Sequence, residues 1–263
     1  MPVKTFDVFE GLPPLKRANN RQSVTELHAH LRRMIMNEEL PAGTELNQAD
    51  LGRRYNVSRG PMREALRLLQ QEGLVDMQLN QRATVRELNG NEVDQLYGAR
   101  VALESLGVRI TAGHLRPDEY EAACARLEEM DDALAHNDMP AWIGEHREFH
   151  QLCSARAEGP LAEIILSYSE RSERYLRYAQ NANPNTFAIA RAEHARILRL
   201  IRSGDADGAS ALMASHLATT AMLVLKGLGV QTKDGVVEKA LTMAGGRMLR
   251  RGNASGRSKS APA

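Results

Sequence analysis

The sequence predicts a mainly α-helical protein in two parts: three helices with a small β-hairpin at the front, then an all-helical antiparallel bundle. Apolar residues recur at helical spacing through most of the chain. The segments that favour strands lie close together, within residues 74–86. A short polar linker, Glu87–Asn91, then separates two stretches that are each long enough to bury a core of their own.

The front part begins with an amphipathic helix over residues 24–35, and residues 1–20 before it are expected to form a flexible arm. A Pro-Ala-Gly sequence at 41–43 ends this helix. Asn47 is then expected to cap a short second helix that runs to Tyr55.

A third helix is predicted from a cap at Ser58 to about Gln71. Two short strands follow, at residues 74–77 and 83–86, joined by a polar turn. Three helices followed by a two-stranded wing is the element order of a winged helix-turn-helix, which would occupy residues 21–88.

The rest of the chain shows helical periods separated by caps and prolines, with no convincing strand. Six helices are predicted, at about residues 91–113, 117–136, 139–156, 159–181, 185–203 and 205–228. Helices of this length with short connections form an antiparallel bundle, which would occupy residues 91–229. The remaining residues, 230–263, are basic and rich in small side chains, so a disordered tail is expected there.

Composition indicates a cytoplasmic globular protein rather than a membrane or secreted one. Apolar residues make up 43% and charged residues 25% of the chain, which is ordinary for a globular protein. No apolar run approaches the ~20 residues that span a bilayer, and the first residues lack the apolar core of a secretory signal. Cys124 and Cys153 form no CxxC pair and are expected to be free thiols in a reducing compartment.

The net charge of +1 conceals an uneven distribution. Basic residues outnumber acidic ones in residues 1–86 and 231–263, whereas acidic residues predominate in between. The two ends, rather than the middle, are therefore suited to approach a polyanion. Aromatic residues are only 4% of the chain, which disfavours a stacking surface for single-stranded nucleic acid.

The third helix of the front part carries the clearest signal for DNA binding. Arg59 and Arg63 are four residues apart, so both side chains project from one face near the start of the helix. Such a face can enter the major groove, where arginine pairs with guanine or contacts phosphates. On spacing alone, an amphipathic helix with merely solvated arginines remains an alternative.

Residues 24–86 resemble the DNA-binding domain of the GntR family of regulators. The matching segments are LPAGTELNQADL (40–51), NVSRGPMREAL (56–66), LQQEGLV (69–75) and ATVREL (83–88). The resemblance implies that Arg59 and Arg63 contact operator DNA beside the helix start at Ser58, so all three are candidate DNA-binding residues.

Two positions depart from the pattern of that family. Ala49 stands where the second helix often has a basic residue, and the wing tip has Gln81-Arg82 in place of Arg-Gly. Glycine would let the wing backbone lie close to the minor groove. Without it, Arg82 is expected to reach that groove with its side chain.

Four of the eight histidines are placed where a metal site could form. His146 and His150 share one face of a predicted helix, while His194 and His216 lie in the middle of two others. Three helices could thus direct four imidazoles to one point, and neutral imidazoles suit zinc, nickel, copper or iron. Ordinary surface or core histidines remain an alternative. The other four are expected to be solvated: His28, His30, His114 and His136.

Residues 91–228 resemble the helical ligand-binding domain of the FadR branch of GntR regulators, called the FCD domain. The shared pieces are LYGARVALESLGVRI, EFHQLCSA, AEHARILRLIRSGDADGA and the HL of MASHLATT. The resemblance implies a divalent metal held by an Asp-x-x-x-His pair and two later histidines, which makes His150, His194 and His216 three of the ligands. His146 occupies the Asp position. A four-histidine set carries less negative charge and favours a borderline metal, zinc or nickel, over manganese.

Arg100 is the candidate for binding an effector. Arg100 and Glu104 are four residues apart on the first helix of the rear part, where a buried ion pair is one expectation. The resemblance implies instead that an arginine near this position helps to hold a ligand carboxylate. Metal and Arg100 together would then bind a small organic acid, such as a hydroxy acid, a sugar acid or an aromatic acid.

These patterns predict a sequence-specific transcription regulator whose affinity for DNA changes when it binds the organic acid. A repressor is expected rather than an activator. One winged helix contacts few base pairs, so a homodimer on a two-fold double-stranded operator is expected. Two alternatives stay open: a rear domain that only dimerises, without metal or effector, and a helical-bundle metalloenzyme. The enzyme is disfavoured, because no general base is paired with the histidines and no nucleophile elbow, P-loop or dinucleotide fingerprint occurs.

Overall fold

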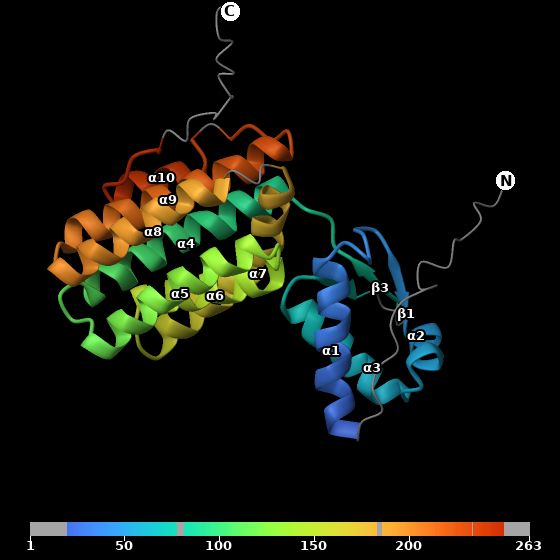
Figure 1. The fold of residues 1–263 in the computed structure, drawn as a ribbon. Helices are drawn as coiled ribbons and strands as arrows, with labels where there is room; N and C mark the ends of the chain where they lie inside the picture. Colours follow the sequence, from blue (N-terminus) through green and yellow to red (C-terminus); the bar gives the residue numbers. More distant parts are fainter. Residues whose placement is uncertain (1–19, 78–81, 183–185, 233, 250–263) are drawn as a thin grey trace, which may run out of the picture. The chain divides into compact units, whose positions relative to one another are not determined.

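The computed structural model describes residues 20–77, 82–182, 186–232 and 234–249 of the chain (Figure 1). The chain divides into two compact units between Leu88 and Asn89. The first unit combines helices with a small sheet, and the described part of the second is all helical. Residues 1–19 of the expected arm and residues 78–81 of the wing turn lie outside the described residues.

The described residues of the first unit form three helices and a three-stranded antiparallel sheet. The helices are α1 (Asn20–Met36), α2 (Gln48–Tyr55) and α3 (Arg59–Gln71), and the strands are β1 (Glu45–Asn47), β2 (Val75–Met77) and β3 (Arg82–Val85). β3 is the central strand, and the register pairs Leu46 with Ala83 and Asp76 with Thr84. The predicted winged helix-turn-helix is confirmed. The sequence did not predict β1, because an alternating pattern cannot stand out over a three-residue strand.

The core of this unit is one apolar cluster to which every helix and strand contributes. Leu31 of α1, Leu46 of β1 and Leu66 of α3 are fully buried in it. Replacing one of these leucines by alanine is expected to cost about 2–5 kcal/mol of stability, because a cavity remains. α3 is strongly amphipathic, since one face enters this cluster and the opposite face carries exposed arginines. The packing of α3 therefore fixes the orientation of its arginines.

The two predicted caps behave differently. The Asn47 side chain accepts hydrogen bonds from the backbone N–H groups of Ala49 at 2.9 Å and Asp50 at 3.3 Å, so the predicted cap of α2 is confirmed. Ser58 occupies the N-cap position of α3, but its side chain makes no capping hydrogen bond. Its backbone carbonyl accepts from the N–H of Met62 instead, and the residue is exposed. The predicted position is correct and the predicted side-chain bond is wrong.

His30 corrects the expectation that the histidines of the front unit are solvated. It is only 5% exposed, and its Nε2 lies 3.2 Å from the hydroxyl of Tyr55 on α2. Arg33, one turn further along α1, donates to Nδ1 of His30. Burial, with the charge of Arg33 in support, lowers the pKa of His30 below its usual value. The imidazole thus links α1 to α2 as a neutral group.

Among its described residues, the second unit contains the six predicted helices and one more. They are α4 (Gly90–Thr111), α5 (Pro117–Ala135), α6 (Met139–Cys153), α7 (Pro160–Ala182), α8 (Thr186–Ser203), α9 (Ala206–Gly227) and α10 (Val236–Met243). α4 and α9 lie side by side along the unit (Figure 1). At the starts of α4 and α9, the side chains of Asn89 and Asp205 accept N-cap hydrogen bonds from backbone N–H groups. α9 has the length and apolarity of a membrane-spanning helix, but 78% of its apolar window is buried inside the unit, as in a core helix.

α10 contradicts the expectation that the whole of residues 230–263 is disordered. The Asp94 carboxylate on α4 accepts from the backbone N–H of Val236 at 2.8 Å and of Val237 at 3.1 Å, which satisfies the free donors at the start of α10. Gly98 leaves room for the helix, because a Cβ there would lie 2.5 Å from Val236. The sequence did not predict α10, since eight residues are too few for a clear period and their stability comes from contacts with α4 and α9.

Candidate DNA interface and metal centre

The exposed face of α3 is the candidate DNA interface. Ser58, Arg59 and Arg63 all lie exposed at the start of this helix. Within the described residues, neither of these two arginines has an ion-pair partner, whereas Arg67 on the next turn is held by Glu64 at 2.7 Å. The two guanidinium groups are therefore available to a ligand in solution.

Arg82, the fourth candidate, lies apart from these residues at the start of β3. Its side chain is 61% exposed and lies 3.7 Å from Glu45 on the neighbouring strand. An exposed pair of this kind contributes little stability. Arg82 is therefore free to exchange Glu45 for another anion. Its predicted neighbour at the wing tip, Gln81, lies outside the described residues.

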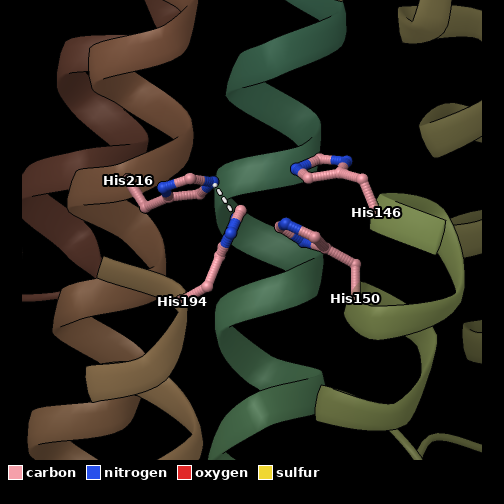
Figure 2. Close-up of side chains that lie close together, drawn as sticks. All are labelled: His146, His150, His194 and His216. Carbon is pink, nitrogen blue, oxygen red and sulfur yellow. Dashed lines mark hydrogen bonds between the residues drawn. The ribbon is translucent and has the colours of Figure 1, made fainter. Parts of the chain in front are cut away.

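All four candidate metal ligands converge in the second unit (Figure 2). α6 supplies His146 and His150, α8 supplies His194, and α9 supplies His216. Each is buried, and their ligand nitrogens all lie within 4.8 Å of one another. The sequence showed which histidines share a helix face, but only the packing of three helices brings the four rings to one point.

Two carboxylates orient two of these imidazoles. Glu104 on α4 accepts from Nδ1 of His150 at 2.8 Å, and Glu193 on α8 accepts from Nδ1 of His216 at 2.7 Å. A ligating histidine commonly donates its other ring N–H to such a carboxylate, which fixes the tautomer and the ring orientation. Sequence analysis gave Glu104 only a role beside Arg100 and did not single out Glu193. Neither contact has a signal in sequence spacing, because the partners lie on different helices.

Of the remaining two imidazoles, His146 is held by a ring contact and His194 by a hydrogen bond to His216. His146 stacks on Trp142, one turn earlier on α6, with ring centroids 4.7 Å apart and an interplanar angle of 19°. Nε2 of His194 lies 3.1 Å from Nε2 of His216. In the neutral tautomer of His216 that donates Nδ1–H to Glu193, Nε2 is the acceptor and His194 is the donor in this hydrogen bond.

The chemistry of this site fits a divalent transition metal. Burial, followed by the charges of the neighbouring imidazoles and of Arg100, lowers the pKa of His146 well below its usual value, so this imidazole is neutral at pH 7. Neutral imidazole is the form that binds metal. Nε2 of His150 is buried and has no hydrogen-bond partner among the described residues. A metal ion would satisfy this orphaned acceptor.

Arg100 forms the buried ion pair that was one of its two expected roles. The side chain is 3% exposed, and it donates from Nε to Glu104 and from Nη1 to the hydroxyl of Ser172, both at 2.7 Å. Burial alone would raise the pKa of Glu104, but the Arg100 guanidinium and the His150 hydrogen bond lower it to about 2. Glu104 is therefore ionised throughout the physiological range.

A small cavity lies between Arg100 and the histidines. Its lining includes Arg100, Tyr97, Trp142, His146 and His216. Tyr97 is fully buried, and burial, opposed by the neighbouring Arg100 and Ser172, raises the pKa of its hydroxyl. The cavity measures about 20 Å³, which is room for about one water molecule. The guanidinium of Arg100, the hydroxyl of Tyr97 and the imidazoles of His146 and His216 thus line a cavity with room for one oxygen atom of a ligand.

A winged helix-turn-helix with free arginines on its third helix, joined to a helical domain with a buried polar centre, defines a DNA-binding regulator with an accessory domain. Residues 24–85 match the family described as bacterial regulatory proteins, gntR family, and residues 95–219 match the FCD domain. The chain belongs to the GntR family of bacterial transcription regulators and carries an FCD domain.

Similar proteins match this chain over most of their length. The HTH-type transcriptional regulator YdhC of Bacillus subtilis (strain 168) is 24% identical over 193 residues, which are 73% of this chain and 86% of that protein. The HTH-type transcriptional repressor RspR of Escherichia coli (strain K12) is 23% identical, over 73% of this chain and 84% of its own. Among solved structures, E. coli McbR/YncC covers 81% of this chain and all of its own, with a TM-score of 0.65 and 22% identity. The chain is a transcription regulator and not an enzyme.

Proposed function

We propose that this regulator is a repressor that acts in the cytoplasm as a homodimer. It binds a two-fold DNA operator through Ser58, Arg59, Arg63 and Arg82, and its second unit holds zinc or nickel together with a small organic acid. The observation that carries the metal part is the convergence of four buried imidazoles, all with ligand nitrogens within 4.8 Å of one another. The repressor role is supported by a similar protein, RspR, that is named a repressor.

The DNA-binding part rests on the two arginines of α3. Both are exposed, both lie near the N-terminal end of the helix, and no acidic side chain among the described residues pairs with either. Arginine at such a position can form two hydrogen bonds with a guanine edge, which discriminates between bases, or bind phosphate, which does not. Arg82 supplies a further cation on the wing strand.

The test is a double variant, Arg59→Ala with Arg63→Ala, measured on duplexes selected from a random pool with the parent protein at one stated salt concentration. We expect a loss of about 1–3 kcal/mol in binding for each arginine. The matched control is Arg196→Ala with Arg199→Ala, which removes two exposed arginines from α8 and the same amount of charge. A folded Arg59/Arg63 variant that still binds as tightly and selectively as the parent would contradict the proposal.

The metal part can be tested by fluorescence, because Trp142 is the only tryptophan of the chain and stacks on His146. Adding Ni²⁺ to protein treated with a chelator should change the Trp142 emission to saturation at one ion per chain. His150→Ala should weaken this binding strongly, whereas His114→Ala, at an exposed histidine outside the cluster, should leave it unchanged. If the parent binds no metal, the alternative of a second unit that only dimerises is favoured.

The effector part rests on the cavity beside Arg100. A cation and a metal ion facing one space would attract a carboxylate, but about 20 Å³ is too small for an organic acid. Binding therefore requires apolar lining residues such as Leu176 and Leu217 to move. Such a movement is how an effector could favour one arrangement of the protein over another, within the limit of its affinity difference for the two. In a titration with candidate acids, unchanged affinity in Arg100→Ala would remove Arg100 from the site.

A further inference from the structure

We infer that Glu104 is a positioning residue of the metal centre: one of its carboxylate oxygens orients His150 towards the metal, and the other is held by Arg100. Oε2 accepts from His150 Nδ1 at 2.8 Å, and Oε1 accepts from Arg100 Nε at 2.7 Å. All three side chains are at most 3% exposed. The inference rests on the proposed metal function and adds a residue that is not itself a ligand.

The hydrogen bonds around Glu104 determine the tautomer of His150. An ionised carboxylate can only accept, so His150 must donate its Nδ1–H to Oε2. In the tautomer with its proton on Nδ1, the imidazole carries a lone pair and no proton on Nε2. That same Nε2 is buried with no partner among the described residues, and it belongs to the nitrogen cluster. Glu104 therefore keeps the lone pair of His150 available where the other three imidazoles converge.

Arg100 explains why a carboxylate at this position stays in place. Nε of Arg100 holds Oε1 of Glu104, and Nη1 of Arg100 is held in turn by Ser172 on α7. A series of hydrogen bonds, Ser172–Arg100–Glu104–His150, thus connects side chains of three helices. A carboxylate fixed at one oxygen can orient a ring at the other without losing rotamer freedom on metal binding.

The requirement for two acceptor oxygens makes glutamine an informative replacement. The side chain of glutamine has nearly the same shape but only one acceptor oxygen, because the other terminal atom is a donor. In Glu104→Gln, the single oxygen can accept a hydrogen bond from either His150 or Arg100. The amide N–H group then faces the other of these two donors. The orientation of His150 is thereby lost while the volume of the side chain is kept.

The experiment is a double-mutant cycle of Zn²⁺ affinity, measured by competition with a chromophoric chelator. We expect Glu104→Gln to weaken Zn²⁺ binding about 10–100-fold in the parent. In the His150→Ala background the same change should have less than about a twofold effect, because Glu104 acts through His150. Ser105→Ala, at the next buried position of α4, is the control and should bind Zn²⁺ like the parent. An equal loss in both backgrounds would mean a general electrostatic or structural effect and would overturn the inference.

A second measurement uses the unmodified protein and remains decisive if Glu104→Gln does not fold. With ¹⁵N-labelled histidine and no metal, the His150 ring, assigned by its absence in His150→Ala, should show a protonated Nδ1 and an unprotonated Nε2. The opposite tautomer would refute the role of Glu104. Parent protein that binds no Zn²⁺ would instead remove the proposed metal function, whereas Zn²⁺ binding that is unaffected by Glu104→Gln would remove only this inference.

Discussion

At the scale of single residues, His146 separates this chain from the Asp-x-x-x-His pattern that the FCD resemblance implied. The structure keeps His146 within the nitrogen cluster, where it stacks on Trp142 and has a lowered pKa. A neutral ring in that place adds a nitrogen donor without adding negative charge. The donor set therefore suits borderline metals rather than hard ones.

His146→Asp should shift metal preference towards manganese. An aspartate supplies an anionic oxygen, which hard cations prefer, in place of a neutral nitrogen. We expect the ratio of Mn²⁺ to Zn²⁺ affinity to rise at least tenfold, measured by equilibrium dialysis with elemental analysis. His146→Asn is the matched control, because it introduces a similar shape without the charge. Equal affinity ratios in the Asp and Asn variants would show that charge at this position does not set the preference.

His30 gives the first unit a dependence on pH. Its pKa is lowered by burial and by Arg33, with Glu39 acting in the opposite direction, so the unfolded chain takes up a proton near pH 6.5 that the folded chain resists. The contribution of the neutral His30 to the free energy of unfolding is complete above pH 6.5 and is lost as the pH falls. The free energy of unfolding then decreases with a limiting slope of about 1.4 kcal/mol per pH unit.

The expected result is that the free energy of unfolding, measured by urea denaturation of metal-free protein, falls less steeply between pH 6.5 and 5.5 in His30→Gln than in the parent. His136→Gln is the control, because that side chain is 72% exposed. Identical slopes in the parent and His30→Gln would show that the buried imidazole accepts a proton in the folded state as readily as in the unfolded one.

At the scale of elements, α10 is a short helix that depends for its stability on the neighbouring helices α4 and α9. Its buried residues Val237, Ala240 and Leu241 provide one narrow apolar face. Isolated helices of this length are not stable in water. The Asp94 cap and the space at Gly98 both come from α4, more than 130 residues earlier in the sequence.

Asp94→Ala should loosen α10 without unfolding the unit. The variant removes two hydrogen bonds to the start of the helix, and loss of such a cap costs about 0.5–2 kcal/mol. Hydrogen exchange followed by mass spectrometry should show faster exchange in residues 236–243 and little change in α6 or α8. Asp118→Ala, at an exposed aspartate of α5, is the control. Unchanged protection of α10 would mean that apolar packing alone holds it.

At the scale of the whole molecule, the chain consists of two compact units, and the proposed metal centre belongs to one of them. The four candidate ligands come from α6, α8 and α9 of the second unit. A ligand that binds only the folded form stabilises that form by mass action. Metal is therefore expected to act on the second unit.

Zinc should raise the unfolding temperature of the second unit more than that of the first. At a free Zn²⁺ concentration 100 times the Kd, the gain is about 2.7 kcal/mol. Calorimetry with and without a chelator should show this, and Cys153 accessibility to a thiol reagent can report on the second unit, because Cys153 is buried next to the site on α6. His150→Ala should reduce the effect. An equal shift of both units would indicate metal binding elsewhere.

Much of this protein was determined by its sequence. Helical spacing of apolar residues, caps such as Asn47, and the order of three helices and a hairpin were sufficient for the winged helix-turn-helix and for six helices of the second unit, because these signals are local. The same spacing placed Arg59 and Arg63 on one exposed face.

Only the tertiary structure decided what the buried polar residues do. Glu104 and Glu193 reach His150 and His216 across helix boundaries, and Arg100 reaches Ser172 on α7. β1 and α10 formed at places where the local signal was too short. The physical reason is common to all of these cases: their free energy comes from contacts between residues far apart in the chain, which no periodicity records.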